Sequence, residues 1–154
     1  VIDTRWNGGG RLHEDIEVLF SGDKYLTQEV HGRPTGEMPS RRWNKPSVMI
    51  IGEANYSNAH GTPWVYKYKN LGKLVGMPVP GTMSSVNWIT LQNPDLLFGV
   101  PVVAFRTAEG NVLENTQLEP DIKVANHPAD IVKGIDAQLE AAVKSLLGDI
   151  DKKK

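Results

Sequence analysis

The sequence contains no cysteine, which excludes disulfide bonds, a thiolate nucleophile and metal sites built on thiolates. No apolar run reaches the roughly 20 residues that a helix needs to cross a bilayer. The formal net charge is only −1, so no basic excess indicates nucleic acid and no acidic block indicates a disordered tail. The 154 residues, 40% of them hydrophobic, are enough for one domain with its own core.

The first ten residues, VIDTRWNGGG, form the most informative pattern. An apolar start gives way to polar residues and then to three glycines, Gly8 to Gly10. Because glycine lacks a Cβ, the amides there can turn toward a ligand and approach it closely. Fixed amides of this kind stabilise negative charge that develops on a substrate oxygen. The chain also starts without an initiator Met or a leading loop, so we expect it to be the C-terminal part of a larger protein.

Hydrophobic periodicity predicts strands that alternate with helices. The predicted strands cover residues 1–4 (buried), 48–51, 73–75, 86–92, 100–105 and 122–124. The predicted helices cover residues 11–20, about 57–71 with Pro63 in the first turn, and a last helix with apolar positions from 135 to 147, closed by Gly148. Residues 33–46 are predicted to be a surface loop and residues 151–154 a solvated end. The alternation implies an α/β layer fold with a largely parallel sheet.

A hydroxyl lies where a buried strand is expected to lead into a helix. Ser57 follows the apolar run 48–51 and precedes the second predicted helix, at the carboxyl end of the sheet. The amides of Asn58 and Ala59 lie in the open first turn of that helix, at the positive end of its dipole. The pattern indicates a nucleophile beside its own oxyanion donors, as acyl transfer requires. The same position suits a helix N-cap, which the local sequence alone favours.

A carboxylate and four histidines are the remaining candidates. Glu114, in NVLENTQLEPDIKV, fits an acid that orients a histidine or a second hydroxyl, and it equally fits an exposed loop acid. The histidines show no paired spacing, so no metal site and no cofactor are expected. His60 is expected to be structural or to line a substrate site, His13 to lie exposed in a first helical turn, and His31 and His127 to be solvated.

Four blocks, VIDTRWNGGG, NYSNAHG, KLVGMPVPGTM and LENTQLEPDIKV, together resemble the tail-specific or carboxyl-terminal processing serine peptidases. The nearest branch is the tricorn catalytic core, and the resemblance extends over nearly the whole chain. It implies an α/β fold of the layered crotonase/ClpP-like spiral type, with a mostly parallel sheet and flanking helices. Residues 1–154 would then be the C-terminal part of such a peptidase domain, with its upstream portion absent.

The resemblance implies roles for four positions. Ser57 matches the nucleophile, and Gly10 and Asn58 match the residues whose backbone amides form the oxyanion hole. Glu114 matches the acid of the tricorn tetrad. Tricorn-like chains have Asp where this chain has Asn58, but the group that contributes is a backbone amide, which the change does not remove.

The general base is where the chain departs from the family. In one branch the base is a lysine, but Thr82 stands at the corresponding position here and Lys73 lies too early. In the tricorn branch a histidine and a helper serine come from a segment upstream of the VIDTRWNGGG strand. We therefore expect the base to come from a missing upstream segment and the 154-residue chain to be inactive alone.

The leading hypothesis is a serine peptidase that acts on a peptide or unfolded protein, with no nucleic-acid partner and no membrane span. Because relatives often assemble into rings, a homo-oligomer is a possible assembly of the chain. The missing base motivates a second hypothesis, a non-catalytic peptide-binding or assembly module with the same fold. A third hypothesis, a crotonase-like acyl-thioester enzyme, shares the spiral and the amide oxyanion hole but gives Ser57 and Glu114 no role.

Overall fold

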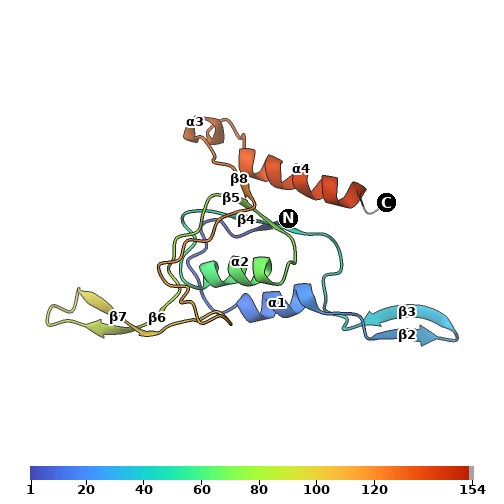
Figure 1. Ribbon diagram of the computed structural model, residues 1–154, viewed down its shortest axis with the longest axis horizontal. Helices are drawn as coiled ribbons and strands as arrows, with labels where there is room; N and C mark the ends of the chain where they lie inside the picture. Colours follow the sequence, from blue (N-terminus) through green and yellow to red (C-terminus); the bar gives the residue numbers. More distant parts are fainter. Residues whose placement is uncertain (153–154) are drawn as a thin grey trace.

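Four short parallel strands form the central sheet of the computed structural model, which describes residues 1–152 (Figure 1). They lie side by side in the order β1 (Ile2–Asp3), β4 (Val48–Ile51), β5 (Lys73–Gly76) and β8 (Ile122–Lys123). Two antiparallel hairpins are separate from the sheet, one of β2 (Leu26–Val30) and β3 (Arg33–Met38), the other of β6 (Ser85–Thr90) and β7 (Leu97–Val103). The helices are α1 (His13–Ser21), α2 (Asn58–Tyr68), α3 (Pro128–Ile131) and α4 (Ala137–Asp151).

Strand β4 is the buried centre of the sheet, and its alternating side chains divide the core into two layers. Met49 packs with Tyr66 of α2 on one face, and Ile50 packs with Ala142 of α4 on the other. Figure 1 shows α1 and α2 on one side of the sheet and α4 on the opposite side. The predicted layered α/β fold, with a parallel sheet flanked by helices, is therefore confirmed.

The prediction of a surface loop over residues 33–46 is wrong for its first part. Residues 33–38 form β3, which pairs with β2 across a turn at His31 and Gly32, where φ is 51° and 75°. Every residue of β2 is exposed, so this strand buries no face. A strand without a buried face has no alternation of apolar and polar residues for a sequence pattern to detect. In Figure 1 this hairpin projects at the opposite end of the molecule from β6–β7.

The first strand and the last helix end at other residues than the sequence predicts. Strand β1 covers only Ile2–Asp3, and Val1, predicted to be buried, is exposed. Gly148 does not close the last helix, because α4 continues to Asp151. A glycine inside a helix costs only about 1 kcal/mol relative to alanine, so the helix tolerates it. Residues 153–154 of the predicted solvated end lie outside the described residues.

Pro63 lies at the sixth position of α2 and not in its first turn, contrary to the sequence prediction. A proline has no N–H to donate to the carbonyl of Ala59, four residues earlier. The buried side chain of Asn55 donates to that carbonyl instead, at 3.0 Å. Asn55 Oδ1 also accepts the N–H of Gly52 at 3.1 Å. One buried amide thus holds the connection from β4 to α2 in shape.

Arg5, which follows β1, joins the sheet to α4. Its guanidinium donates to Asp3 at 2.7 Å, to Asp136 at 2.8 Å and to Gln138 at 3.0 Å. Asp136 also caps α4 by accepting the N–H of Leu139 at 3.0 Å. The hydrogen bonds from Arg5 lower the pKa of both aspartates, and the same bonds raise the pKa of Arg5. All three groups are therefore charged at neutral pH.

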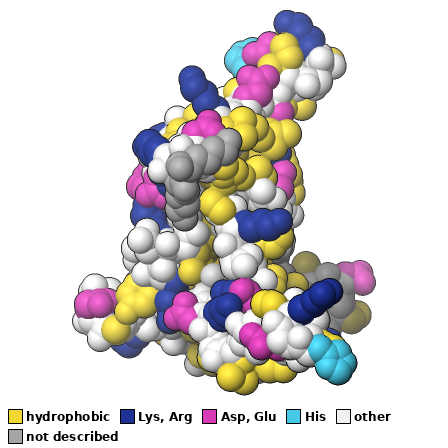
Figure 2. Space-filling model, turned by 90° about the vertical axis from the view of Figure 1, so that its right-hand side faces the viewer, with side chains coloured by type: hydrophobic (Ala, Val, Ile, Leu, Met, Phe, Trp, Pro, Cys, Tyr) yellow, Lys and Arg dark blue, Asp and Glu magenta, His cyan; other side chains and the backbone are white. Residues whose placement is uncertain are grey.

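The surface has no dominant charge. Figure 2 shows acidic and basic side chains interspersed over the face turned toward the viewer. Within residues 1–152, no helix has both the length and the apolar character needed to span a membrane.

Candidate active site

Ser57 has an unusual backbone conformation at the junction between β4 and α2. Its φ is 56° and its ψ is −124°, directly before the first residue of the helix. A positive φ is uncommon for a non-glycine residue and costs about 1–3 kcal/mol, so the surroundings must hold it. Ser57 occupies the N-cap position of α2, as the alternative expected, but its side chain makes no capping hydrogen bond. Within residues 1–152 no hydrogen-bond partner occupies the hydroxyl, which leaves it available for chemistry.

The triple-glycine segment lies directly against this junction. A Cβ added to Gly9 would lie 2.8 Å from Ser57 Cβ and 2.9 Å from the carbonyl oxygen of Tyr56. Gly9 also has a φ of +104°, a conformation that side chains disfavour. Asn7 fixes the approach, because its carbonyl accepts the N–H of Tyr56 at 3.0 Å and its Oδ1 accepts the N–H of Gly9 at 2.8 Å.

Gly10, Ser57 and Asn58 line one pocket of about 230 Å³, which we call the polar pocket. Among residues 1–152, the backbone amides of Gly10 and Asn58 donate to no partner. Asn58 is the first residue of α2, where the helix supplies no acceptor and its dipole favours negative charge. The structure therefore brings together the Ser57 hydroxyl and the amides of Gly10 and Asn58. The amide of Ala59, which the sequence also predicts to be open, instead donates to the carbonyl of Tyr56 at 3.0 Å.

The side chain of Asn58 does not point freely into this pocket. Its Nδ2 donates to Nδ1 of His13 at 2.7 Å. Since Nδ1 accepts, the proton of a neutral His13 ring lies on Nε2, and the ring then presents a donor and not a base. His13 is half-buried and lines the polar pocket, so the expectation of an exposed first-turn histidine is wrong. The contact with Asn58, 45 residues away, is the reason.

Ser57 also lines a second pocket, of about 320 Å³, which we call the apolar pocket. Glu114 and Thr82 lie in it together with side chains of the β6–β7 hairpin. The indole of Trp88 lies against Gly99, where an added Cβ would be 3.0 Å from the ring. The nucleophile candidate therefore stands between a polar and a largely apolar hollow.

Glu114 and Thr82 are fixed by backbone contacts around Ser57. Glu114 Oε2 accepts the N–H of Met83 at 2.7 Å, and Thr82 Oγ1 accepts the N–H of Ser57 at 3.3 Å. Glu114 is only half-buried, but this hydrogen bond and its place in the apolar pocket distinguish it from a simple exposed loop acid. Thr82 therefore supports the strained residue through its hydroxyl oxygen.

His60 lies beneath the site and lines neither pocket. It is 1% exposed, and its Nδ1 donates to the carbonyl of Pro80 at 2.9 Å, while Nε2 has no partner among the described residues. Burial lowers the pKa of His60, and the Pro80 hydrogen bond and the charge of Glu114 oppose that shift. The expected structural role fits this position.

The remaining candidates lie away from Ser57. Lys73 binds Asp149 of α4 at 2.9 Å. His31 is exposed in the β2–β3 turn, and His127 accepts the N–H of Ala129 at the start of α3. No group of three metal-ligating side chains occurs within residues 1–152.

Several residues of the site escape sequence reasoning. The support that Thr82 gives to Ser57 and the hydrogen bond from Met83 to Glu114 depend on chain segments that meet only in the fold. The wall formed by Trp88 and Phe98 lies on a mostly exposed hairpin. The alternation of Val86 and Trp88 along β6 is the one local signal that could have indicated a shared face.

Comparison with known proteins identifies the family of this arrangement. Residues 1–124 match the model of peptidase family S41. The tricorn protease of Thermoplasma volcanium is 28% identical over 159 residues, which cover 100% of this chain and 15% of the relative. A tricorn-like protease C-terminal subunit of Sulfurisphaera tokodaii is 26% identical, over 99% of this chain and 18% of the relative. The chain thus spans less than a fifth of these relatives.

Solved structures give the same fold. The crystal structure of the tricorn protease matches 97% of this chain and 15% of its own, with a TM-score of 0.84 and 22% identity. The photosystem II D1 C-terminal processing protease matches 80% of this chain and 33% of its own, with a TM-score of 0.55 and 17% identity. The resemblance drawn from the four sequence blocks is confirmed.

A substitution of Gly9 tests the close approach of the glycine segment to Ser57. Gly9→Ala should lower the free energy of unfolding by at least about 2 kcal/mol, because alanine at positive φ is strained and its Cβ overlaps Ser57. Gly8→Ala is the matched control, since an added Cβ there meets nothing within 4 Å. Urea unfolding of both variants gives the comparison. Equal stabilities would contradict the described packing.

The buried His60 predicts a pH dependence of stability. Burial lowers the pKa of His60 in the folded chain, so below the ordinary pKa of about 6.5 the unfolded chain binds more protons at this residue than the folded chain does. The contribution of His60 to the free energy of unfolding is complete above pH 6.5 and is lost as the pH falls. The free energy of unfolding decreases through this group by at most about 1.4 kcal/mol per pH unit. His60→Gln should flatten the profile of unfolding free energy against pH just below pH 6.5, measured by urea unfolding. The exposed control His31→Gln should leave the profile unchanged, and an unchanged slope in His60→Gln would refute this origin.

Proposed function

The chain belongs to peptidase family S41, and from that premise we propose that it supplies the nucleophile side of a serine peptidase site. Ser57 attacks the carbonyl carbon of a peptide bond and forms a tetrahedral intermediate. The observation that supports this most directly is the strained turn at Ser57, which leaves its hydroxyl uncapped beside two unpaired amides. A strained strand-to-helix turn exposes a hydroxyl for attack in other hydrolases as well.

The amides of Gly10 and Asn58 form the oxyanion hole in this proposal. Both residues line the polar pocket with Ser57, and neither amide has a partner among the described residues. A fixed donor of this kind contributes about 3–4 kcal/mol to stabilisation of the transition state in enzymes where it has been removed. The contact of the Asn58 side chain with His13 leaves the backbone amide of Asn58 free for this role.

Glu114 orients the base that removes the proton from Ser57. One of its carboxylate oxygens is bound to the amide of Met83, which leaves the other oxygen to accept a hydrogen bond from an incoming group. Its place in the apolar pocket, on the wall shared with Ser57, supports this role. In the same proposal, an imidazole that enters between them meets both side chains.

The base itself comes from a polypeptide segment outside this chain. Among the described residues, His13 presents a donor to the pocket, His60 is buried beneath it, and Lys73 is paired with Asp149. We infer that residues 1–154 are the C-terminal part of a larger peptidase domain whose substrate is a peptide or an unfolded protein. The same lack of a base favours the second candidate, a peptide-binding or assembly module without activity.

The decisive test compares the parent polypeptide, including its upstream segment, with variants at two serines. Ser57→Ala should lower kcat/KM for peptide hydrolysis at least about 1,000-fold and abolish labelling by a fluorophosphonate, because both need the nucleophile. Ser84→Ala is the matched control, since Ser84 lines both pockets but does not occupy the strained turn. Its activity should stay within about tenfold.

Two outcomes would separate the parts of the proposal. Unchanged hydrolysis by Ser57→Ala refutes the nucleophile, whereas rapid turnover by the 154-residue chain alone refutes an external base. A parent polypeptide that binds peptides but is neither labelled nor active supports the non-catalytic module.

A further inference from the structure

A hollow of about 880 Å³ lies at the carboxyl ends of the four parallel strands. It is lined by residues that stand one or two positions after the strands, namely Arg5, Gly52, Met77 and Ala125. It shares no lining residue with the polar or the apolar pocket beside Ser57. Ligands of parallel α/β sheets bind outside the carboxyl ends of the strands, so this is a favourable place for a second site. We call it the strand-end hollow.

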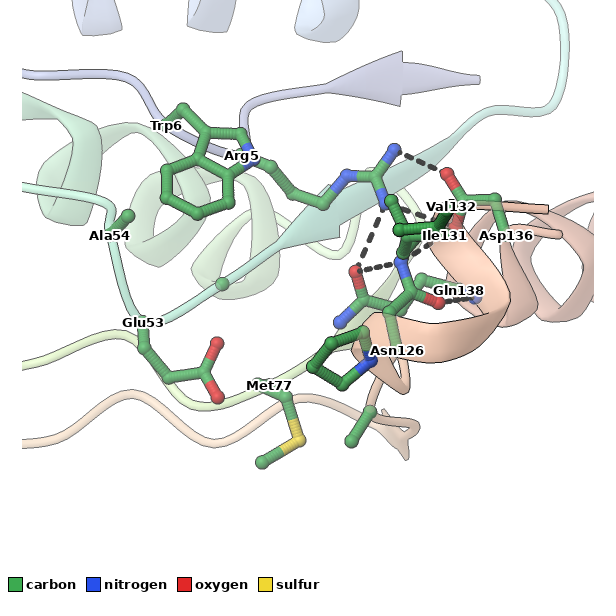
Figure 3. Close-up of a pocket in the computed structure, with 13 residues that line it drawn as sticks. Arg5, Trp6, Glu53, Ala54, Met77, Asn126, Ile131, Val132, Asp136 and Gln138 are labelled. Carbon is green, nitrogen blue, oxygen red and sulfur yellow. Dashed lines mark hydrogen bonds and ion pairs between the residues drawn. The ribbon is translucent and has the colours of Figure 1, made fainter. Parts of the chain in front are cut away.

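The walls of this hollow are mainly apolar and unusually exposed. Trp6 has a φ of 66° and is 84% exposed, and Val132 is 89% exposed. Figure 3 shows the indole of Trp6 on one side of the hollow, with Ile131 and Val132 across from it and Met77 at its edge. A tryptophan at positive φ is held outward at a cost in strain, which favours a role in contact with a ligand.

The charges around the hollow favour a cation. The guanidinium of Arg5 is shared by Asp3 and Asp136, so two negative charges face one positive charge. Glu53 adds a third carboxylate, and within residues 1–152 it forms no hydrogen bond or ion pair. Figure 3 shows the Glu53 carboxylate directed toward the middle of the lining residues, on the same side as Trp6.

We propose that the strand-end hollow binds the basic side chain of an extended peptide, with lysine as the simplest example. The cation lies near the ring of Trp6 and pairs with the carboxylate of Glu53, since an aromatic face and a carboxylate both attract an ammonium group. The aliphatic stem packs against Met77 and Val132, as lysine methylenes pack on apolar surfaces elsewhere. The site stands independently of the chemistry assigned to Ser57.

Binding is measured on the parent polypeptide with Ser57→Ala, so that no turnover can occur. The probes are two N-acetylated, C-amidated pentapeptides, one with lysine between two alanine pairs and one with norleucine in its place. Titration calorimetry should give at least tenfold tighter binding of the lysine peptide, and higher salt should weaken that preference. Norleucine keeps the methylenes and removes the charge, so the comparison isolates the cation.

Two variants of the hollow then test whether the lysine peptide binds there. Glu53→Gln should weaken binding of the lysine peptide at least fivefold and leave binding of the norleucine peptide unchanged. Trp6→Leu should weaken binding of the lysine peptide at least threefold. Both side chains are exposed, so the variants should fold. Glu29→Gln, on the exposed strand β2, is the matched control and should change nothing.

Three results would overturn the proposal. Equal affinities for the two peptides would refute the preference for a cation. Unchanged binding of the lysine peptide by Glu53→Gln would refute its binding in the strand-end hollow. Concentration-dependent dimerisation that is lost in Val132→Asp, without peptide binding, would instead make the hollow an interface between copies of the chain. Because no step uses the hydroxyl of Ser57, an inactive peptidase site would leave all of these results interpretable.

Discussion

Gly9 and Ser57 approach so closely that a methyl group on Gly9 would lie 2.8 Å from the Cβ of Ser57. This approach requires that the chain after β1 reach the carboxyl end of β4, which the parallel pairing of the two strands ensures. Next to this contact Ser57 has a positive φ, and the backbone amide of Asn58, the first residue of α2, has no partner among the described residues. Residues from both sides of the contact, Gly10, Ser57 and Asn58, line the polar pocket.

The connection from β4 to α2 contributes residues to the strand-end hollow, the polar pocket and the apolar pocket. Gly52 and Glu53 line the strand-end hollow, and Ser57 lines the two pockets on the other side of the connection. Asn55 lies buried between them and replaces the hydrogen bond that Pro63 cannot make. A short segment without regular structure is therefore fixed by buried side-chain hydrogen bonds, which a site that positions charge requires.

The sequence could predict the parts of the fold and site that depend on local pattern. The apolar run of β4 and the start of α2 were sufficient for the fold, because buried strands and helix starts have local signatures. The roles of Gly10, Ser57 and Asn58 came from the resemblance of the four sequence blocks to a family, since the local sequence alone favoured a helix N-cap at Ser57. The β2–β3 hairpin was missed because it buries no face of β2. The contacts of His13 with Asn58 and of Glu114 with Met83 join residues 45 and 31 positions apart, and no local pattern encodes them.

The measurement that tests this account most directly compares the unfolding free energies of Ser57→Gly and Ser57→Ala. At an ordinary position alanine is the more stabilising residue by about 0.5–1 kcal/mol, because glycine loses more backbone entropy. At a φ of 56° and a ψ of −124° the order should reverse, with the glycine variant more stable by about 1 kcal/mol. An alanine variant that is equally stable or more stable would contradict the strained turn on which the proposed site depends.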